Sequence, residues 1–203
     1  MEVNTCIDRI KSYCKKANFI FQLHNCGRKV IDVNSLRNNT VILVIDANEK
    51  GRETFAHVIC YLVYKGKLFF ADPGGESPSY YPVNSEHWLP DAPNIIRKDI
   101  QADHRTCGLF NDLIIRLFTT GLSPRYIATF FNKNSISINH SIIRQYQQHY
   151  NIKFDFHRRR VDKDFIPSSK ATKIFNRICK RVGPPAKRGP SFKAARTKQQ
   201  RRH

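Results

Sequence analysis

Apolar residues in the first half of the chain follow a helical period and then change to short continuous runs. Val3, Ile7, Ile10 and Cys14 fall on one helical face, which predicts an amphipathic helix over residues 3–16. The runs that follow are rich in β-branched and aromatic residues and predict strands at 19–21, 41–45, 57–64 and 68–71. The last three follow one another closely along the chain, so we expect an antiparallel meander rather than a parallel sheet, which needs longer crossovers.

A helical period returns at Cys107, after which the apolar residues form one broad stripe that ends at Gly121. Ser123 before a proline predicts a further helix over 124–132, and Asn139 is expected to cap a third helix that runs to about residue 150. Between the strands and these helices, residues 73–94 are rich in Pro, Ser, Tyr and Gly. They predict a long surface loop.

Positive charge gathers at the C-terminal end. The formal net charge is +19, and residues 157–203 hold sixteen Lys or Arg and two Asp, a net of +14. This segment has little apolar surface to bury, so we expect a domain over 1–156 and a largely disordered basic tail over 157–203. The spacing of Ile174 and Ile178 allows one short helix within that tail.

So concentrated a positive field suggests a polyanionic partner, with nucleic acid first. A nuclear-localisation signal or a merely solvated tail fits the same composition equally well. If the tail binds DNA, the expected contacts are Arg158, Arg159, Arg160, Lys187, Arg188, Arg196, Lys198, Arg201 and Arg202.

The six cysteines form no Cys-x-x-Cys pair, which argues against a zinc ribbon, and no metal or other cofactor is expected for the chemistry. No run is apolar enough for a membrane span, and the first residues do not have the pattern of a secretory signal. We therefore expect a protein that is not secreted and not in a membrane, whose cysteines are thiols. A disulfide between two of them is the alternative that the sequence leaves open.

One cysteine, Cys107, has the position of a nucleophile. It opens a helix, where unpaired backbone N–H groups and the helix dipole favour a thiolate, and Gly108 after it allows close approach. Its alternative role is that of a small apolar residue at the start of a core helix, which is what most cysteines are.

Two further residues could activate that thiol. His57 starts one strand and Asp72 ends the next, so antiparallel pairing would place both at the same end of the sheet, as a His–carboxylate pair requires. Gln101, six residues before Cys107, could donate to an oxyanion beside the Cys107 N–H. Taken singly, His57 fits a core histidine, Asp72 a turn cap and Gln101 a solvated loop residue. His104 is a less favoured alternative base.

In combination these residues resemble the adenovirus endopeptidase family and the related SUMO- and ubiquitin-like-protein proteases. The matching stretches are Gly-Arg-Glu-Thr at 51–54 with His57, Phe-Phe-Ala-Asp-Pro-x-Gly at 69–75, and Gln-x5-Cys-Gly-Leu-Phe at 101–110. They cover about residues 40–120. Three positions depart from the family pattern. Val58 follows His57 where Trp is usual, Thr106 precedes Cys107 where Asp is frequent, and Asp72 replaces the viral enzyme's Glu.

The resemblance implies an α+β fold with a small, mostly antiparallel sheet and a central helix that begins at Cys107. It implies a cysteine endopeptidase in which His57 is the base, Asp72 orients it, Gln101 and the Cys107 N–H bind the oxyanion, and Trp88 could shield the site. Relatives cut after small residues, often Gly. With the basic tail, the resemblance points to a virus, a virophage or a Maverick/Polinton element.

In that setting we expect a monomer in the virion and in the host nucleus or viral factory. Its substrates would be capsid and core precursors cut during maturation, with possible activation by DNA or a viral peptide. Two alternatives stay open: a ubiquitin- or SUMO-like-protein-specific protease, and a non-enzymatic nucleic-acid-binding virion protein in which Cys107 is a core residue.

Overall fold

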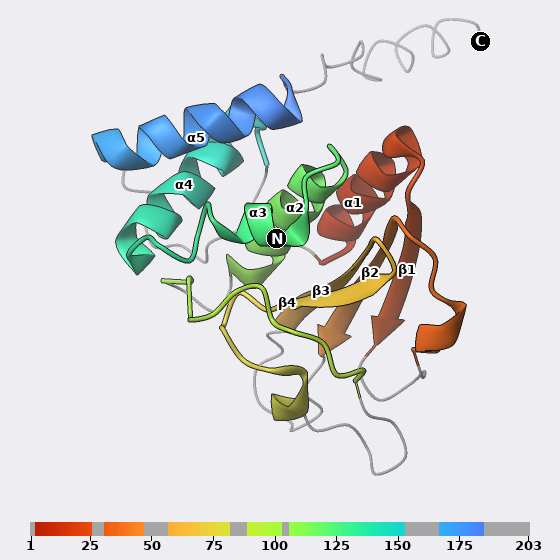
Figure 1. The fold of residues 1–203 in the computed structure, drawn as a ribbon. Helices are drawn as coiled ribbons and strands as arrows, with labels where there is room; N and C mark the ends of the chain where they lie inside the picture. Colours follow the sequence, from red (N-terminus) through yellow and green to blue (C-terminus); the bar gives the residue numbers. More distant parts are fainter. Residues whose placement is uncertain are drawn as a thin grey trace, which may run out of the picture.

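One mixed four-stranded sheet forms the centre of the fold, in the order β1-β2-β3-β4 (Figure 1). The computed structural model describes residues 3–25, 31–46, 57–81, 89–102, 106–152 and 167–184. Its strands are β1 (Ile20–Asn25), β2 (Thr40–Asp46), β3 (His57–Tyr64) and β4 (Lys67–Ala71). β2, β3 and β4 pair antiparallel, as predicted, and β1 pairs parallel to β2. The expected α+β class with a mostly antiparallel sheet is therefore confirmed.

The helices are α1 (Val3–Ala17), α2 (Cys107–Phe118), α3 (Pro124–Ala128), α4 (Ile136–His149) and α5 (Ser169–Val182), with short 3-10 turns η1 (Val33–Ser35) and η2 (Pro78–Tyr80). α1 and α2 cover one face of the sheet, and α4 and α5 lie further out (Figure 1). α2 begins at Cys107, as expected, and almost all of its side chains are buried. No helix among the described residues is long and apolar enough to cross a bilayer.

Both faces of the sheet are covered, which explains the unbroken apolar runs of β2 and β3. Leu43 and Cys60 face the helices, while Ile42, Val44 and Tyr61 face the opposite side. Since successive strand residues point to opposite faces, a strand buried on both sides has no polar alternation.

The segment over residues 73–94, expected as a surface loop, is in part a packed layer. Pro78, Tyr81 and Ala92 are buried, and the last two belong to the apolar cluster on the far face of the sheet. Apart from η2 and an isolated bridge at Asn94, the described part of this segment is irregular, as a loop prediction expects. It is not all on the surface, because aromatic and proline side chains in it supply the cover that the second face of the sheet needs.

Two helix boundaries also differ from the prediction. α3 ends at Ala128, before the expected residue 132. α4 begins four residues earlier than expected, because Ser135 is its cap and accepts a hydrogen bond from the Ile138 N–H. Asn139 lies buried inside the helix, where its amide donates to the carbonyl of Phe131 at 3.2 Å.

Within the region expected as a tail, α5 folds against the rest of the molecule. Ala171, Phe175 and Ile178 are buried in the same core as α2 and α4. Ordered structure therefore extends past the predicted boundary at residue 156, because this amphipathic helix finds an apolar surface to cover. The tail itself stays a prediction, since residues 153–166 and 185–203 lie outside the described residues.

Candidate active site

His57 and Asp72 meet at one end of the sheet. Nε2 of His57 lies 2.8 Å from Oδ1 of Asp72. The arrangement follows from the antiparallel pairing, in which Cys60 is opposite Ala71, so the start of β3 lies beside the residues that follow β4. Asp72 is fully buried and the His57 side chain is 22% exposed, so the pair has one face open to solvent.

The Asp72 carboxylate is held by four donors. Besides His57, it accepts hydrogen bonds from the N–H of Gly74 at 2.8 Å and of Glu76 at 3.0 Å, and from the Tyr81 hydroxyl at 2.6 Å. Burial alone would raise the pKa of Asp72, but the bonds from His57 and Tyr81 outweigh it and lower the pKa. The carboxylate is therefore charged at neutral pH and fixed in orientation.

Cys107 lies close enough to His57 to contribute to the raised pKa of the histidine. Burial opposes protonation of His57, yet the interactions with Asp72 and Cys107 prevail and raise its pKa to about 10. An imidazolium at neutral pH is the partner that a thiolate requires.

Asn111, which sequence reasoning missed, ties the nucleophile's helix to the histidine's strand. Its amide donates to the carbonyl of Val58 at 2.6 Å and to that of Cys107 at 3.0 Å. Asn111 is fully buried, one helical turn after Cys107. The signal in the sequence was an Asn among the apolar residues of a predicted core helix, because a buried amide needs a buried hydrogen-bond partner.

Gln101 is buried rather than solvated, with 4% of its surface exposed. Both atoms of its side-chain amide lack a hydrogen-bond partner among the described residues. Its Nε2 lies near the Gly74 turn, where a Cβ added to Gly74 would be 3.6 Å from it. Leaving a buried amide unpaired costs about 1–3 kcal/mol, which makes Gln101 an exception among the buried polar side chains.

Tyr81 was also missed. Its ring stacks on that of His57, with centroids 5.6 Å apart and planes 12° from parallel, while its hydroxyl donates to Asp72. It therefore covers one face of the imidazole, the role the sequence suggested for Trp88. Trp88 and His104 lie outside the described residues, as do Arg158, Arg159, Arg160, Lys187, Arg188, Arg196, Lys198, Arg201 and Arg202.

The other cysteines in the described ranges differ from Cys107 in their surroundings. Cys6, Cys14 and Cys60 are buried free thiols, and burial raises the pKa of each. Cys60 is a core residue, as expected. Cys179 is partly exposed and free. Over the described ranges, no group of three or more His, Cys, Asp or Glu side chains could hold a metal ion.

Protein-family models, curated proteins and solved structures were compared with this chain, and none of them matches it. The resemblance to the adenovirus endopeptidase family therefore rests on the quoted motifs alone.

Proposed function

We propose that this protein is a cysteine endopeptidase with Cys107 as nucleophile, His57 as base, Asp72 as orienting carboxylate and Gln101 as oxyanion donor. The observation that carries the proposal is the 2.8 Å hydrogen bond between His57 and Asp72, with Cys107 near enough to raise the pKa of that histidine. The three residues are separated by 15 and 35 positions along the chain. A charged, immobilised Asp72 beside a histidine of raised pKa fits this role better than it fits a turn cap.

In the proposed reaction, the Cys107 thiolate attacks the carbonyl carbon of a peptide bond. The oxygen becomes negative and accepts hydrogen bonds from the Cys107 N–H and the otherwise unpaired Gln101 amide. Protonated His57 then gives its proton to the leaving amine as the C–N bond breaks, which leaves a thioester. Neutral His57 next takes a proton from water, whose oxygen attacks the thioester and releases the acid and the thiolate.

The substrate assignment comes from the family resemblance alone. It favours cleavage after small residues in capsid and core precursors during virion maturation, by a monomer that the basic tail retains near packaged DNA. The rival within enzymes acts on ubiquitin- or SUMO-like conjugates. Incubation with such conjugates beside candidate capsid proteins separates the two.

A thiol-reactive probe tests the central claim. Cys107 is 3% exposed, whereas Cys179 is partly exposed, so labelling governed by access alone favours Cys179. We expect a substrate-like electrophile to modify Cys107 first at pH 7, because reactivity follows the thiolate. Cys107→Ala should lose both labelling and cleavage, and the matched Cys179→Ala variant should keep both. Preferential labelling of Cys179 contradicts the proposal and, if no substrate is cleaved, favours a non-enzymatic virion protein. Cleavage by Cys107→Ala contradicts the choice of Cys107 as nucleophile.

A further inference from the structure

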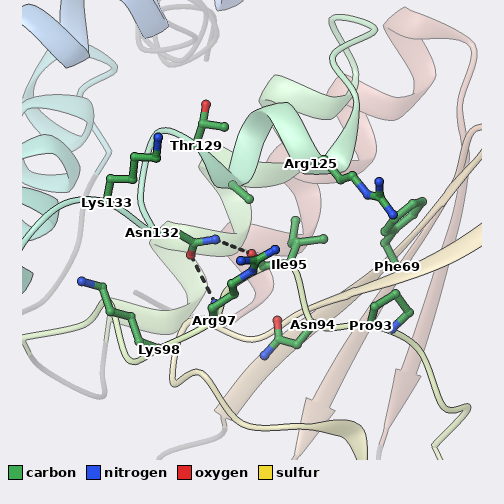
Figure 2. A pocket seen from close by; sticks show the side chains of 11 residues that line it. Phe69, Pro93, Asn94, Ile95, Arg97, Lys98, Arg125, Thr129, Asn132 and Lys133 are labelled. Carbon is green, nitrogen blue, oxygen red and sulfur yellow. Dashed lines mark hydrogen bonds between the residues drawn. The ribbon is translucent and has the colours of Figure 1, made fainter.

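A basic pocket lies beside the edge strand β4, between the segment 93–98 and the end of α3. Its volume is about 640 Å³, within the range of small-molecule sites. Figure 2 shows Lys98 and Lys133 on one side, Arg125 beside Phe69 on the other, and Arg97 between them. The four cations come from two separate stretches of chain, so the fold, rather than a local run of charge, brings them to one cavity.

None of these four side chains is neutralised by the described part of the chain. No acidic residue lines the pocket, and the two ion pairs found in the described ranges involve other residues. All four side chains are exposed. Like charges around one cavity repel one another, and an anion with several charges relieves that repulsion. Guanidinium groups also match phosphate oxygens in two-point hydrogen bonding.

The pocket wall is already fixed without a ligand. The Asn132 amide donates to the carbonyl of Ile95 at 2.8 Å and its oxygen accepts from the N–H of Arg97 at 3.2 Å (Figure 2). This pair of hydrogen bonds joins the turn after α3 to the segment 93–98. A site whose walls are held in place loses less entropy when its ligand binds.

The same wall leads to the candidate active site. Oδ1 of Asn94, which lines the pocket, accepts from the N–H of Asp72 at 3.4 Å and of Ile96 at 2.9 Å. Further along, the Ile100 N–H donates to the carbonyl of Pro73 at 3.0 Å, and the next residue is Gln101. The segment that carries two of the pocket's cations thus also holds the Asp72 turn and the proposed oxyanion donor.

We propose that this pocket binds the phosphate groups of a compact polyanion, and that binding stabilises the segment 93–101. The first part stands independently of the peptidase proposal. The second part deepens that proposal, because the ordered segment ends at Gln101. The ligand class follows from four cations that no described acidic residue pairs with, in a cavity of small-molecule size. The several charges of one short polyphosphate can neutralise all four.

Calorimetry on the full chain with inorganic tripolyphosphate tests the site. Arg97→Gln with Lys133→Gln should weaken binding at least tenfold. The matched control, Lys11→Gln with Lys170→Gln, removes two exposed charges from α1 and α5 and should change affinity less than twofold. Equal weakening in both would overturn the site, since it would show attraction to net charge alone. Lys98→Gln with Arg125→Gln repeats the test on the other two cations, and thermal melts verify folding.

Two further measurements identify the source of the phosphate groups and test whether binding stabilises the segment 93–101. A short DNA duplex should bind the pocket variant and the control equally; a tenfold loss confined to the pocket variant would overturn the compact ligand in favour of a nucleic-acid backbone. Tripolyphosphate should slow hydrogen exchange at residues 96–101 in the wild-type chain and not in the pocket variant. Binding without that protection would overturn the coupling. Neither measurement uses Cys107, so failure of the peptidase proposal would leave both results standing.

Discussion

Two buried carboxylates, Asp72 and Asp112, have similar surroundings and different consequences. Each is fully buried, and each pairs with a cationic side chain that is 22% exposed, His57 in one case and Arg9 in the other. Each also accepts a hydrogen bond from a tyrosine hydroxyl, at 2.6 Å from Tyr81 and at 2.9 Å from Tyr146. The comparison separates what a site needs for chemistry from what a core needs for packing.

The two partners differ in whether they can exchange a proton. Arg9 keeps its charge at every accessible pH, so its pair with Asp112 can only hold α1 against α2, with Tyr146 adding α4. His57 can give up its proton, and the thiol of Cys107 lies near enough to affect its pKa. The carboxylates differ as well. Burial raises the pKa of Asp112 against the Arg9 charge, whereas Asp72 has two backbone donors in addition and its pKa is lowered.

The largest difference between the clusters should be in catalysis. Asp72→Asn is expected to lower kcat by about 10³–10⁴, since the amide cannot hold the imidazole in its working orientation and charge state. Asp112→Asn, the matched change in the other cluster, should leave kcat per folded molecule within about twofold. Steady-state kinetics below both melting temperatures measures this. Comparable losses in both variants would show that Asp72 acts on stability alone.

The second largest effect should appear at Gln101, where function and stability are expected to move in opposite directions. Gln101→Met removes the oxyanion donor and should lower kcat by about 10²–10³. It also replaces a buried, unpaired amide by an apolar side chain of similar size, which should raise stability by about 1 kcal/mol.

Asn111→Leu is the matched control, because its amide has two partners that the substitution would leave without a donor. That variant should lose stability, as followed by urea unfolding. If Gln101→Met is both active and no more stable than the wild type, the amide is neither an oxyanion donor nor unpaired.

Much of the fold followed from pattern, because strands and helices reflect local periodicity. The predicted reversal of chain direction between β3 and β4 was enough to predict that His57 and Asp72 lie at the same end of the sheet. The sequence did not predict the contacts of Tyr81 with His57 and Asp72, because Tyr81 lies in a stretch rich in Pro and Ser whose composition predicts a surface loop. It also did not predict that β1 pairs parallel to β2. Arg9 and Asp112 are 103 positions apart, and no local signal pairs two residues at that separation. Contacts between residues far apart in the sequence produce no local periodicity, so sequence patterns cannot predict them.

A third prediction concerns stability: loss of the Asp112 charge should lower the free energy of unfolding, as loss of the Asp72 charge is expected to lower activity. Asp112→Asn leaves Arg9 without its counter-charge and should destabilise the fold by about 3 kcal/mol, at the lower end for a buried pair because Arg9 is partly exposed. Arg9→Met with Asp112→Leu, which removes both charges, should recover most of that loss. Urea unfolding of the three chains tests the pair. A double variant less stable than Asp112→Asn would mean that the ion pair itself stabilises the fold.

The smallest expected effect is a displacement of the pH profile. Release of the leaving amine needs protonated His57, so the rate should fall as pH rises through its pKa of about 10. Asp72→Asn removes the bond that raises this pKa most, and the alkaline limb of its residual activity should move toward the ordinary value for histidine, about 6.5. Arg9→Met alters the other cluster and should leave the limb in place. Measuring kcat/KM from pH 5 to 11 on a freshly reduced sample would detect the shift. If the wild type, Asp72→Asn and Arg9→Met all show the same alkaline limb, a group other than His57 supplies the proton.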